Sequence, residues 1–281
     1  MSEHPVLACY RGLDSADAIV LGALLAAALT EPLVLAGAYR YEPVSLSART
    51  PEASDNARRA DAAQAALRRA RRFVGTDLEV RQEIVPADNI GSALVALARD
   101  LDACVLVLGR DTQGKITRSL VPRAPCPVAV APLSVPLPRP TLGQRIGVAY
   151  DGSPPAQHAL VVAMRLAVCT GARLVLLAAG PTSEQASRWL RVSRLSLGPT
   201  VERETRALVG DPAQSLARAS AELDLDLLVC GSRGRGRPLA TILGSVSLHL
   251  IEHAECPVIV VPPSRWRSDG GPLGVACAAN A

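Results

Sequence analysis

The residues best suited to chemistry lie in a glycine-rich segment of the second half of the chain. Gly231, Gly234, Gly244 and Ser245 form a G-x2-G-x9-G-S pattern that follows an apolar stretch. Glycines allow the backbone to approach an anion closely, so that main-chain N–H groups can point at phosphate oxygens. A helix is predicted to begin near Val246, and unpaired N–H groups at a helix start favour negative charge. The segment therefore predicts a phosphate-binding loop, although such glycines can also serve only as turn residues.

Asp151 is the second candidate for a chemical role. It ends a strand that is predicted over residues 145–150, so its carboxylate should face the same sheet edge as the glycine-rich segment. A carboxylate at this place can accept hydrogen bonds from ribose hydroxyls or hold a metal beside phosphates. The tetrapeptide Asp-Gly-Ser-Pro also suits a simple turn, and both interpretations remain open. Residues 210–213, Gly-Asp-Pro-Ala, should form a third loop at this edge.

Short apolar runs alternate with helical patterns around these loops. In the second half, strands are predicted over residues 145–150, 173–179, 200–208, 225–230 and 258–261, and helices over residues 156–169, 183–193, 212–222 and 246–253. This alternation predicts a doubly wound α/β unit, in which a parallel sheet is covered by helices on both faces. In such a unit, ligands bind at the carboxyl ends of the strands near a topological switch point.

The chain is a repeat of two such units. Residues 124–132 resemble residues 254–262, and residues 6–12 resemble residues 146–152. The first half carries about 18 extra residues, which we expect between its second and third strands. The expected divisions are a first domain at 1–133, a Pro-rich linker at 134–143, a second domain at 144–263 and a flexible tail at 264–281.

The second half resembles a universal stress protein domain of the ATP-binding subgroup. The resemblance is carried by Asp151-Gly152-Ser153, by residues 210–213, by the segment from Gly231 to Ser245 and by Cys256-Pro257-Val258. It extends more weakly over residues 5–132, so the whole chain resembles a tandem universal stress protein. The resemblance implies two Rossmann-like domains, each with a five-stranded parallel sheet. It also implies ATP between the loops that follow strands one and four, often with Mg²⁺.

The motif and the resemblance together give a set of expected nucleotide contacts. These residues are Ala149, Asp151, Ala179, Gly210, Gly231, Ser232, Arg233, Gly234, Gly244, Ser245, Val246 and Ser247. Ala179 comes from the resemblance alone, because adenine in this family usually meets backbone near the end of strand two. Arg233, Arg235 and Arg237 flank the glycines, and they either help to neutralise phosphates or keep an exposed loop soluble.

The first half departs from this pattern. Arg11 takes the place of Asp151, and Pro-Ala-Asp-Asn at residues 86–89 replaces the Gly-Asp-Pro-Ala loop. Gly109 is followed by a shorter loop without a Gly-Ser pair. We therefore predict a structural or regulatory pseudo-site there and one competent site per chain. Single domains of the family commonly pair, so the two halves are expected to form an internal pseudo-dimer, and a further homodimer remains open.

Composition limits the classes of partner. The net charge is only +4 and aromatic residues make up 2%, which argues against a binder of single-stranded nucleic acid. The longest apolar run, residues 19–29, is too short to cross a bilayer, and the first five residues lack the basic start of a signal peptide. We expect a cytoplasmic protein without nucleic-acid or membrane partners.

The seven cysteines contain no CxxC pair. Cys9, Cys104, Cys230 and Cys256 lie in or beside apolar stretches, so buried, reduced thiols are predicted, whereas Cys277 in the tail should be exposed.

Two further groups of residues have open roles. Arg58, Arg59, Arg68, Arg69, Arg71 and Arg72 lie on an alanine-rich predicted helix. They form either a solvated face or a surface for an acidic or nucleic-acid partner. His249 and His253 are four residues apart, so they either share a metal or lie on a helix surface without one.

Three functions fit these observations. The preferred one is an ATP-binding stress or signalling protein that is not an enzyme and whose nucleotide changes its shape or its choice of an unidentified protein partner. The second is slow ATP hydrolysis or phosphoryl transfer, for which no residue is an obvious water-activating base. The third is a nucleotide-free scaffold in which the glycines only make turns.

Overall fold

The computed structural model of the 281-residue chain describes residues 3–10, 16–42, 51–110, 115–132, 142–195, 202–232 and 243–262. The predicted tail lies outside the described residues, as does the predicted linker except for its last two residues. No helix within the described part is both long enough and apolar enough to cross a membrane.

Each half alternates strands with helices. The first half contains β1 (Val6–Cys9), α1 (Ala16–Leu29), β2 (Leu33–Arg40), α2 (Pro51–Ala70), η2 (Arg71–Phe73), β3 (Val80–Ala87), α3 (Ile90–Asp100), β4 (Val105–Gly109), α4 (Lys115–Leu120), η3 (Val121–Arg123) and β5 (Val128–Ala131). The second half contains β6 (Arg145–Ala149), α5 (Pro154–Thr170), β7 (Arg173–Gly180), α6 (Ser183–Leu195), β8 (Arg203–Val209), α7 (Pro212–Glu222), β9 (Leu227–Gly231), α8 (Ser245–His253) and β10 (Val258–Val261). The strands and helices predicted for the second half are confirmed, with bounds that agree within about three residues.

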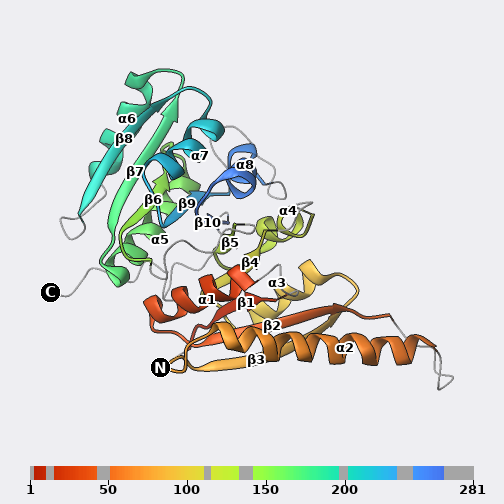
Figure 1. Ribbon diagram of the computed structural model, residues 1–281. Helices are drawn as coiled ribbons and strands as arrows, with labels where there is room; N and C mark the ends of the chain where they lie inside the picture. Colours follow the sequence, from red (N-terminus) through yellow and green to blue (C-terminus); the bar gives the residue numbers. More distant parts are fainter. Residues whose placement is uncertain are drawn as a thin grey trace.

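The ten strands in the described part of the chain belong to one sheet, in the order β3-β2-β1-β4-β5-β10-β9-β6-β7-β8. The five strands of each half are parallel, which confirms the predicted doubly wound architecture. The halves meet through β5 and β10, which pair antiparallel with Ile259 opposite Ala129. In Figure 1 the first half occupies the lower part of the molecule and the second half the upper part, with β5 and β10 between them. The expected internal pairing of the halves is therefore a continuous sheet.

The two central strands are buried on both faces. Every residue of β5 and of β10 is buried, which is why both read as uninterrupted apolar runs in the sequence. Ile259 and Val261 enter the core beneath α1, α2, α5 and α6, whereas Val258 and Val260 enter the core beneath α3, α4, α7 and α8. Each of these two cores continues across both halves.

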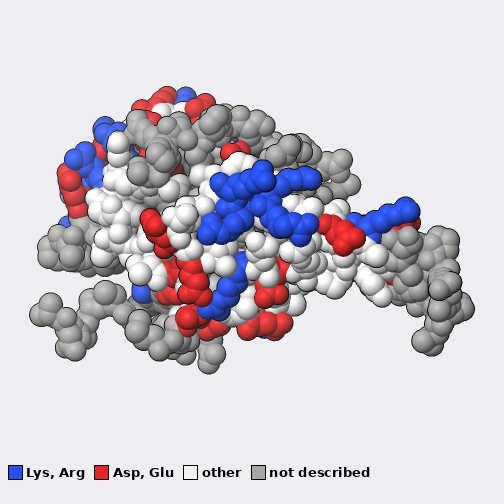
Figure 2. All heavy atoms as spheres, turned by 60° about the horizontal axis from the view of Figure 1, so that its bottom comes forward, with Lys and Arg blue, Asp and Glu red and all other residues white. Residues whose placement is uncertain are grey.

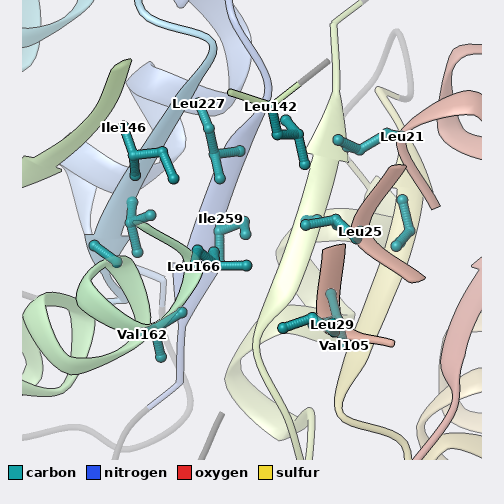
Figure 3. Close-up of a cluster of buried hydrophobic side chains, with 14 of the residues drawn as sticks. Leu21, Leu25, Leu29, Val105, Leu142, Ile146, Val162, Leu166, Leu227 and Ile259 are labelled. Carbon is teal, nitrogen blue, oxygen red and sulfur yellow. The ribbon is translucent and has the colours of Figure 1, made fainter. Parts of the chain in front are cut away.

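Figure 3 shows the first of these cores at the junction. Leu21 and Leu25 of α1 come from one half, and Val162, Leu166 and Ile259 come from the other. These five side chains are fully buried. At about 25 cal/mol per Å² of apolar surface, their burial stabilises the contact between the halves together with each half itself.

The end of the predicted linker is part of this core. Leu142 is 7% exposed and lies among the side chains of both halves in Figure 3. The N–H groups of Gln144 and Arg145 both donate to Oδ2 of Asp226, at 2.7 and 2.9 Å. Leu142 therefore packs with the core that both halves share, and the backbone at residues 144 and 145 is bound to the second half.

The extra length of the first half lies where it was expected. Between β2 and β3 there are 39 residues, whereas 22 residues separate β7 from β8. The 20-residue α2 and the short η2 occupy much of the longer segment, and the 13-residue α6 occupies the shorter one.

The cysteines are unpaired in the described part of the chain. Cys9, Cys104, Cys126, Cys230 and Cys256 are buried and Cys169 is exposed, which confirms the prediction for the four cysteines of the apolar stretches. Burial raises the pKa of Cys126, Cys230 and Cys256 to about 12. These thiols are therefore neutral at physiological pH and act as small apolar groups. Cys277 lies outside the described residues.

Truncation at the junction should destabilise both halves together. We expect Ile259→Ala to lower the free energy of unfolding by about 2–5 kcal/mol, because it leaves a cavity in a core that both halves share. Urea unfolding followed by circular dichroism measures this change. Val168→Ala is the control, since Val168 is 58% exposed on α5 and its truncation should change stability by less than about 0.5 kcal/mol. A change of that small size for Ile259→Ala would contradict the shared core.

Candidate functional site

A cavity of about 400 Å³ opens at the carboxyl ends of β6, β7 and β9. The chain runs from β6 outward to β7 and β8 and then returns to β9, which lies on the other side of β6. The cavity therefore lies at the topological switch point, where ligands bind in open α/β sheets. Its lining residues are Ala149, Tyr150, Asp151, Ala156, Leu177, Ala179, Gln185, Trp189, Pro212, Leu216, Cys230, Gly231, Gly244, Ser245, Val246 and Ser247.

Most of the predicted contact residues meet in this cavity. Those that line it are Ala149, Asp151, Ala179, Gly231, Gly244, Ser245, Val246 and Ser247. Gly210 and Ser232 are described but do not line it. Arg233 and Gly234 lie outside the described residues, as do Arg235 and Arg237, so their roles remain predictions.

The start of α8 is held firmly beside the end of β9. The N–H of Gly244 donates to the carbonyl of Ser232 at 2.8 Å, and the hydroxyl of Ser247 donates to the carbonyl of Gly231 at 2.9 Å. Gly244 is the N-cap and has no side chain that could accept from the first turn. The N–H groups of Ser245, Val246 and Ser247 lie in the turn that has no acceptors within the helix. Because all three residues line the cavity, an anion there can meet a helix N-terminus.

A buried hydroxyl lies at the base of this loop. Ser232 is 1% exposed, and its Oγ makes no hydrogen bond within the described part of the structure. A buried polar atom without a partner is costly, typically about 1–3 kcal/mol, and such atoms concentrate at functional positions.

Asp151 is the one charged residue among the described residues that line the cavity. Its Oδ1 accepts a hydrogen bond from the N–H of Ser153 at 2.9 Å, and Ser153 in turn caps α5. The turn interpretation is therefore confirmed. It does not exclude the binding interpretation, because the same carboxylate lies on the wall of the cavity.

Gly231 has a packing role that the sequence did not reveal. A Cβ atom at this position would lie 2.8 Å from the backbone carbon and oxygen of Pro155, at the start of α5. Real Cβ atoms do not approach backbone so closely, so β9 and α5 can pack together here only because residue 231 is glycine.

The opposite wall of the cavity is apolar. Leu177 and Ala179 come from β7, Leu216 comes from α7, and Trp189 comes from α6. Gly180 of β7 lies beside the indole, and a Cβ at that position would make an ordinary van der Waals contact with the ring of Trp189 at 3.4 Å. Burial raises the pKa of the lining thiol of Cys230 to about 12, so this wall carries no charge.

Sequence reasoning missed Gln185, Trp189 and Leu216 as lining residues. Each lies on a helix, where a periodic pattern shows which residues are apolar but does not show which strand end the helix passes. Trp189 is one of only two tryptophans in the chain, and that rarity was the available signal.

The loop at residues 210–213 has a clear structural role. Gly210 has φ +124°, and the side chain of Asp211 caps α7 by accepting from the N–H of Gln214 at 3.0 Å. In the first half, Asn89 caps α3 in the same way by accepting from the N–H of Ser92 at 2.9 Å. The substituted loop of the first half therefore keeps the capping function, whereas Arg11 and residues 111–114 lie outside the described residues.

The protein ligands at the cavity suit Mg²⁺ only if phosphate oxygens also coordinate the metal. Within the described part of the chain, no three His, Cys, Asp or Glu side chains come together as a metal site. Mg²⁺ commonly takes one or two protein carboxylates and completes its shell with phosphates and water, and Asp151 offers one such carboxylate. The rings of His249 and His253 stack with centroids 4.0 Å apart, and no third ligand joins them among the described residues.

A larger cavity of about 800 Å³ lies elsewhere, between α1 and residues 73–79 of the first half. Pro32 and Glu79, which line it, directly precede the first residues of β2 and β3, so it opens at the amino ends of these strands. None of the predicted contact residues lines it. We therefore assign the candidate site to the smaller cavity at the carboxyl edge.

The arginines of α2 and η2 are spread over a mixed surface. Arg68, Arg69 and Arg72 are exposed, whereas Arg71 donates to the carbonyls of Val74 and Gly75. Figure 2 shows basic side chains gathered over the end of α2, with acidic side chains close by. Nearer the start of α2, Arg58 pairs with Asp55, and Arg59 pairs with Glu42.

The comparisons with known proteins agree with this fold. The pattern that defines the universal stress protein family matches residues 184–262. Universal stress protein Rv2005c from Mycobacterium tuberculosis is 32% identical over 229 residues, which cover 71% of this chain and 75% of that protein. A shorter universal stress protein from Thermus aquaticus is 32% identical over 130 residues, or 41% of this chain and 95% of that protein. The crystal structure of a universal stress protein from Archaeoglobus fulgidus aligns with a TM-score of 0.72 and 18% identity, over 91% of this chain and 97% of that one.

Gly231→Ala should destabilise the protein in the absence of any ligand. The added methyl group would overlap the backbone of Pro155, so we expect a loss of about 1–3 kcal/mol in urea unfolding. Gly75→Ala is the matched control, because a Cβ at Gly75 meets nothing within 4 Å and should change stability by less than about 0.5 kcal/mol. Equal stabilities of the two variants would show that the close approach at Gly231 is not needed.

Proposed function

The chain belongs to the universal stress protein family as a tandem member, and from that premise we propose that its second half binds ATP and acts as a nucleotide-dependent stress or signalling regulator. The observation that supports this most is a convergence of three chemistries in one cavity. A helix start suited to phosphates, a single carboxylate and an apolar wall meet at the switch point of the sheet. The cavity, at about 400 Å³, falls in the usual size range for sites of small ligands.

Each part of the nucleotide has a matching part of the cavity. The N–H groups at the start of α8, from Ser245 to Ser247, would hold the phosphates, and Mg²⁺ would add positive charge beside them. Asp151 would accept hydrogen bonds from the ribose hydroxyls or contact the metal. The adenine would lie against the uncharged wall near Ala179 and Trp189.

A binding role suits these residues better than catalysis. The described residues that line the cavity include no histidine, lysine or glutamate that could activate water. Oδ1 of Asp151 already accepts from the N–H of Ser153. His249 and His253 lie on α8 but do not line the cavity.

Two alternative functions are each favoured by a specific observation. Slow ATP hydrolysis would use Asp151, which supplies the one carboxylate among the described lining residues. A nucleotide-free scaffold is favoured by the structural roles of Gly231 and Asp211, which the fold needs without any ligand. The two alternatives differ from the proposed function in measurable ways.

Calorimetric titration of nucleotide-free protein with Mg-ATP should give one ATP per chain. We expect Gly244→Val to weaken binding at least tenfold, because a β-branched side chain would occupy the approach to the start of α8. Gly244 has φ −67° and ψ 150°, which valine adopts without strain, so the variant should fold. Gly75→Ala serves as the control. No binding by the wild type would favour the scaffold, and two ATP per chain would contradict the predicted pseudo-site of the first half.

The rate of ATP hydrolysis distinguishes the proposed regulator from the enzymatic alternative. We expect wild-type protein with Mg-ATP to release phosphate no faster than the buffer background, because the described lining residues include no histidine, lysine or glutamate to activate water. Hydrolysis clearly above background that is lost in Asp151→Ala would instead establish the enzymatic alternative.

A further inference from the structure

An arginine of the first half is bound to the helix that forms the candidate site in the second half. Arg110 directly follows β4, and its guanidinium donates from Nη1 to the carbonyl of Glu252 at 3.0 Å and from Nη2 to the carbonyl of Ala254 at 2.9 Å. Glu252 lies in the last turn of α8, and Ala254 is its C-cap. One half of the molecule therefore caps a helix of the other.

This contact suits the chemistry of a helix end. The last carbonyls of a helix have no partners within it, and positive charge is favourable beside them. The planar guanidinium presents several donors in a fixed geometry, so it can satisfy two carbonyls together. Burial lowers the pKa of Arg110, and its hydrogen bonds to the two carbonyls offset part of the loss of hydration, whereas its buried Nε has no partner within the described residues.

A second contact at the same end is more exposed. Nη2 of Arg118, on α4, lies 2.8 Å from Oε1 of Glu252, and the side chain of Arg118 is 53% exposed. Exposed ion pairs of this kind are weak, so Arg110 is the stronger link between the first half and α8.

The other end of α8 lines the candidate site through Ser245, Val246 and Ser247. The helix has nine residues and is therefore only about 14 Å long. A helix of two to three turns moves as one body, so a shift of its last turn also moves its first-turn N–H groups.

Comparison of the two repeats shows that the residue making this link is an arginine in the first half and has no arginine counterpart in the second. Arg110 and Ser232 occupy matching places, because the N–H of each donates to the last residue of its half's final strand, Ala131 or Val261, at 3.1 and 2.8 Å. The first half places an arginine there, and the second half places a short serine. The arginine can reach across the junction and the serine cannot.

We propose that Arg110 is a positioning residue for the nucleotide site of the second half, and that it couples nucleotide binding to the contact between the halves. This inference rests on the proposed function. The first half thereby has a role toward the site without binding nucleotide itself. Coupling between sites is reciprocal, so ATP that prefers the anchored position of α8 also tightens the contact at Arg110. A partner that loosens this contact weakens ATP binding.

The test compares Arg110→Gln, Arg110→Lys and the matched control Arg118→Gln in the full-length chain. Calorimetric titration with Mg-ATP should show at least fivefold weaker binding for Arg110→Gln, a smaller loss for Arg110→Lys and a change within about twofold for Arg118→Gln. Arg110→Lys keeps the positive charge, so it preserves the test if Arg110→Gln does not fold.

Amide hydrogen exchange provides a measurement that a purely structural role of Arg110 would leave unchanged. ATP should slow exchange of the amides of the last turn of α8 in the wild type, and this protection should disappear in Arg110→Gln. Wild-type affinity and wild-type protection in Arg110→Gln would overturn the inference and leave the proposed function standing. If the wild type bound no ATP, the proposed function and this inference would both fail.

Discussion

The antiparallel pairing of β5 with β10 is the constraint on which the rest of the molecule depends. Each half is a parallel sheet whose last strand is apolar on both faces, and an uncovered edge of this kind would expose backbone donors together with hydrophobic side chains. Joining the two edges removes both problems at once. It also brings α1 against α5, and it places the end of α8 within reach of the first half.

The junction connects the candidate site of the second half to a residue of the first half. The first turn of α8 lines the cavity, and its last turn is bound by a side chain from the other half. A short helix that is held at one end and meets a ligand at the other can transmit a change in either direction. The proposed regulatory function needs such a connection, because its output would be a change of shape or of contacts.

Comparison of the two halves distinguishes the features that the fold requires from those that belong to the candidate site. Asn89 caps α3 as Asp211 caps α7, and the N–H groups of Tyr10 and Tyr150 bind the second strand of their halves at 2.9 and 2.8 Å. These features support helices and strand ends, so both halves keep them. The Gly-Ser pair at the start of α8 also lines the cavity, and the loop after Gly109 in the first half has no such pair.

The sequence by itself determined the repeat, the alternation of strands and helices and the strand-end position of Asp151 and the glycine-rich segment. These properties depend on local periodicity and on turn residues, and both can be recognised from residues that are close together in the sequence. The tertiary structure alone decided that the two sheets merge, that Trp189 lines the cavity, that Gly231 packs against Pro155 and that Arg110 caps α8. Each of these is a contact between segments far apart in the chain. Such a contact depends on how helices and strands pack in space, and a local sequence pattern does not predict it.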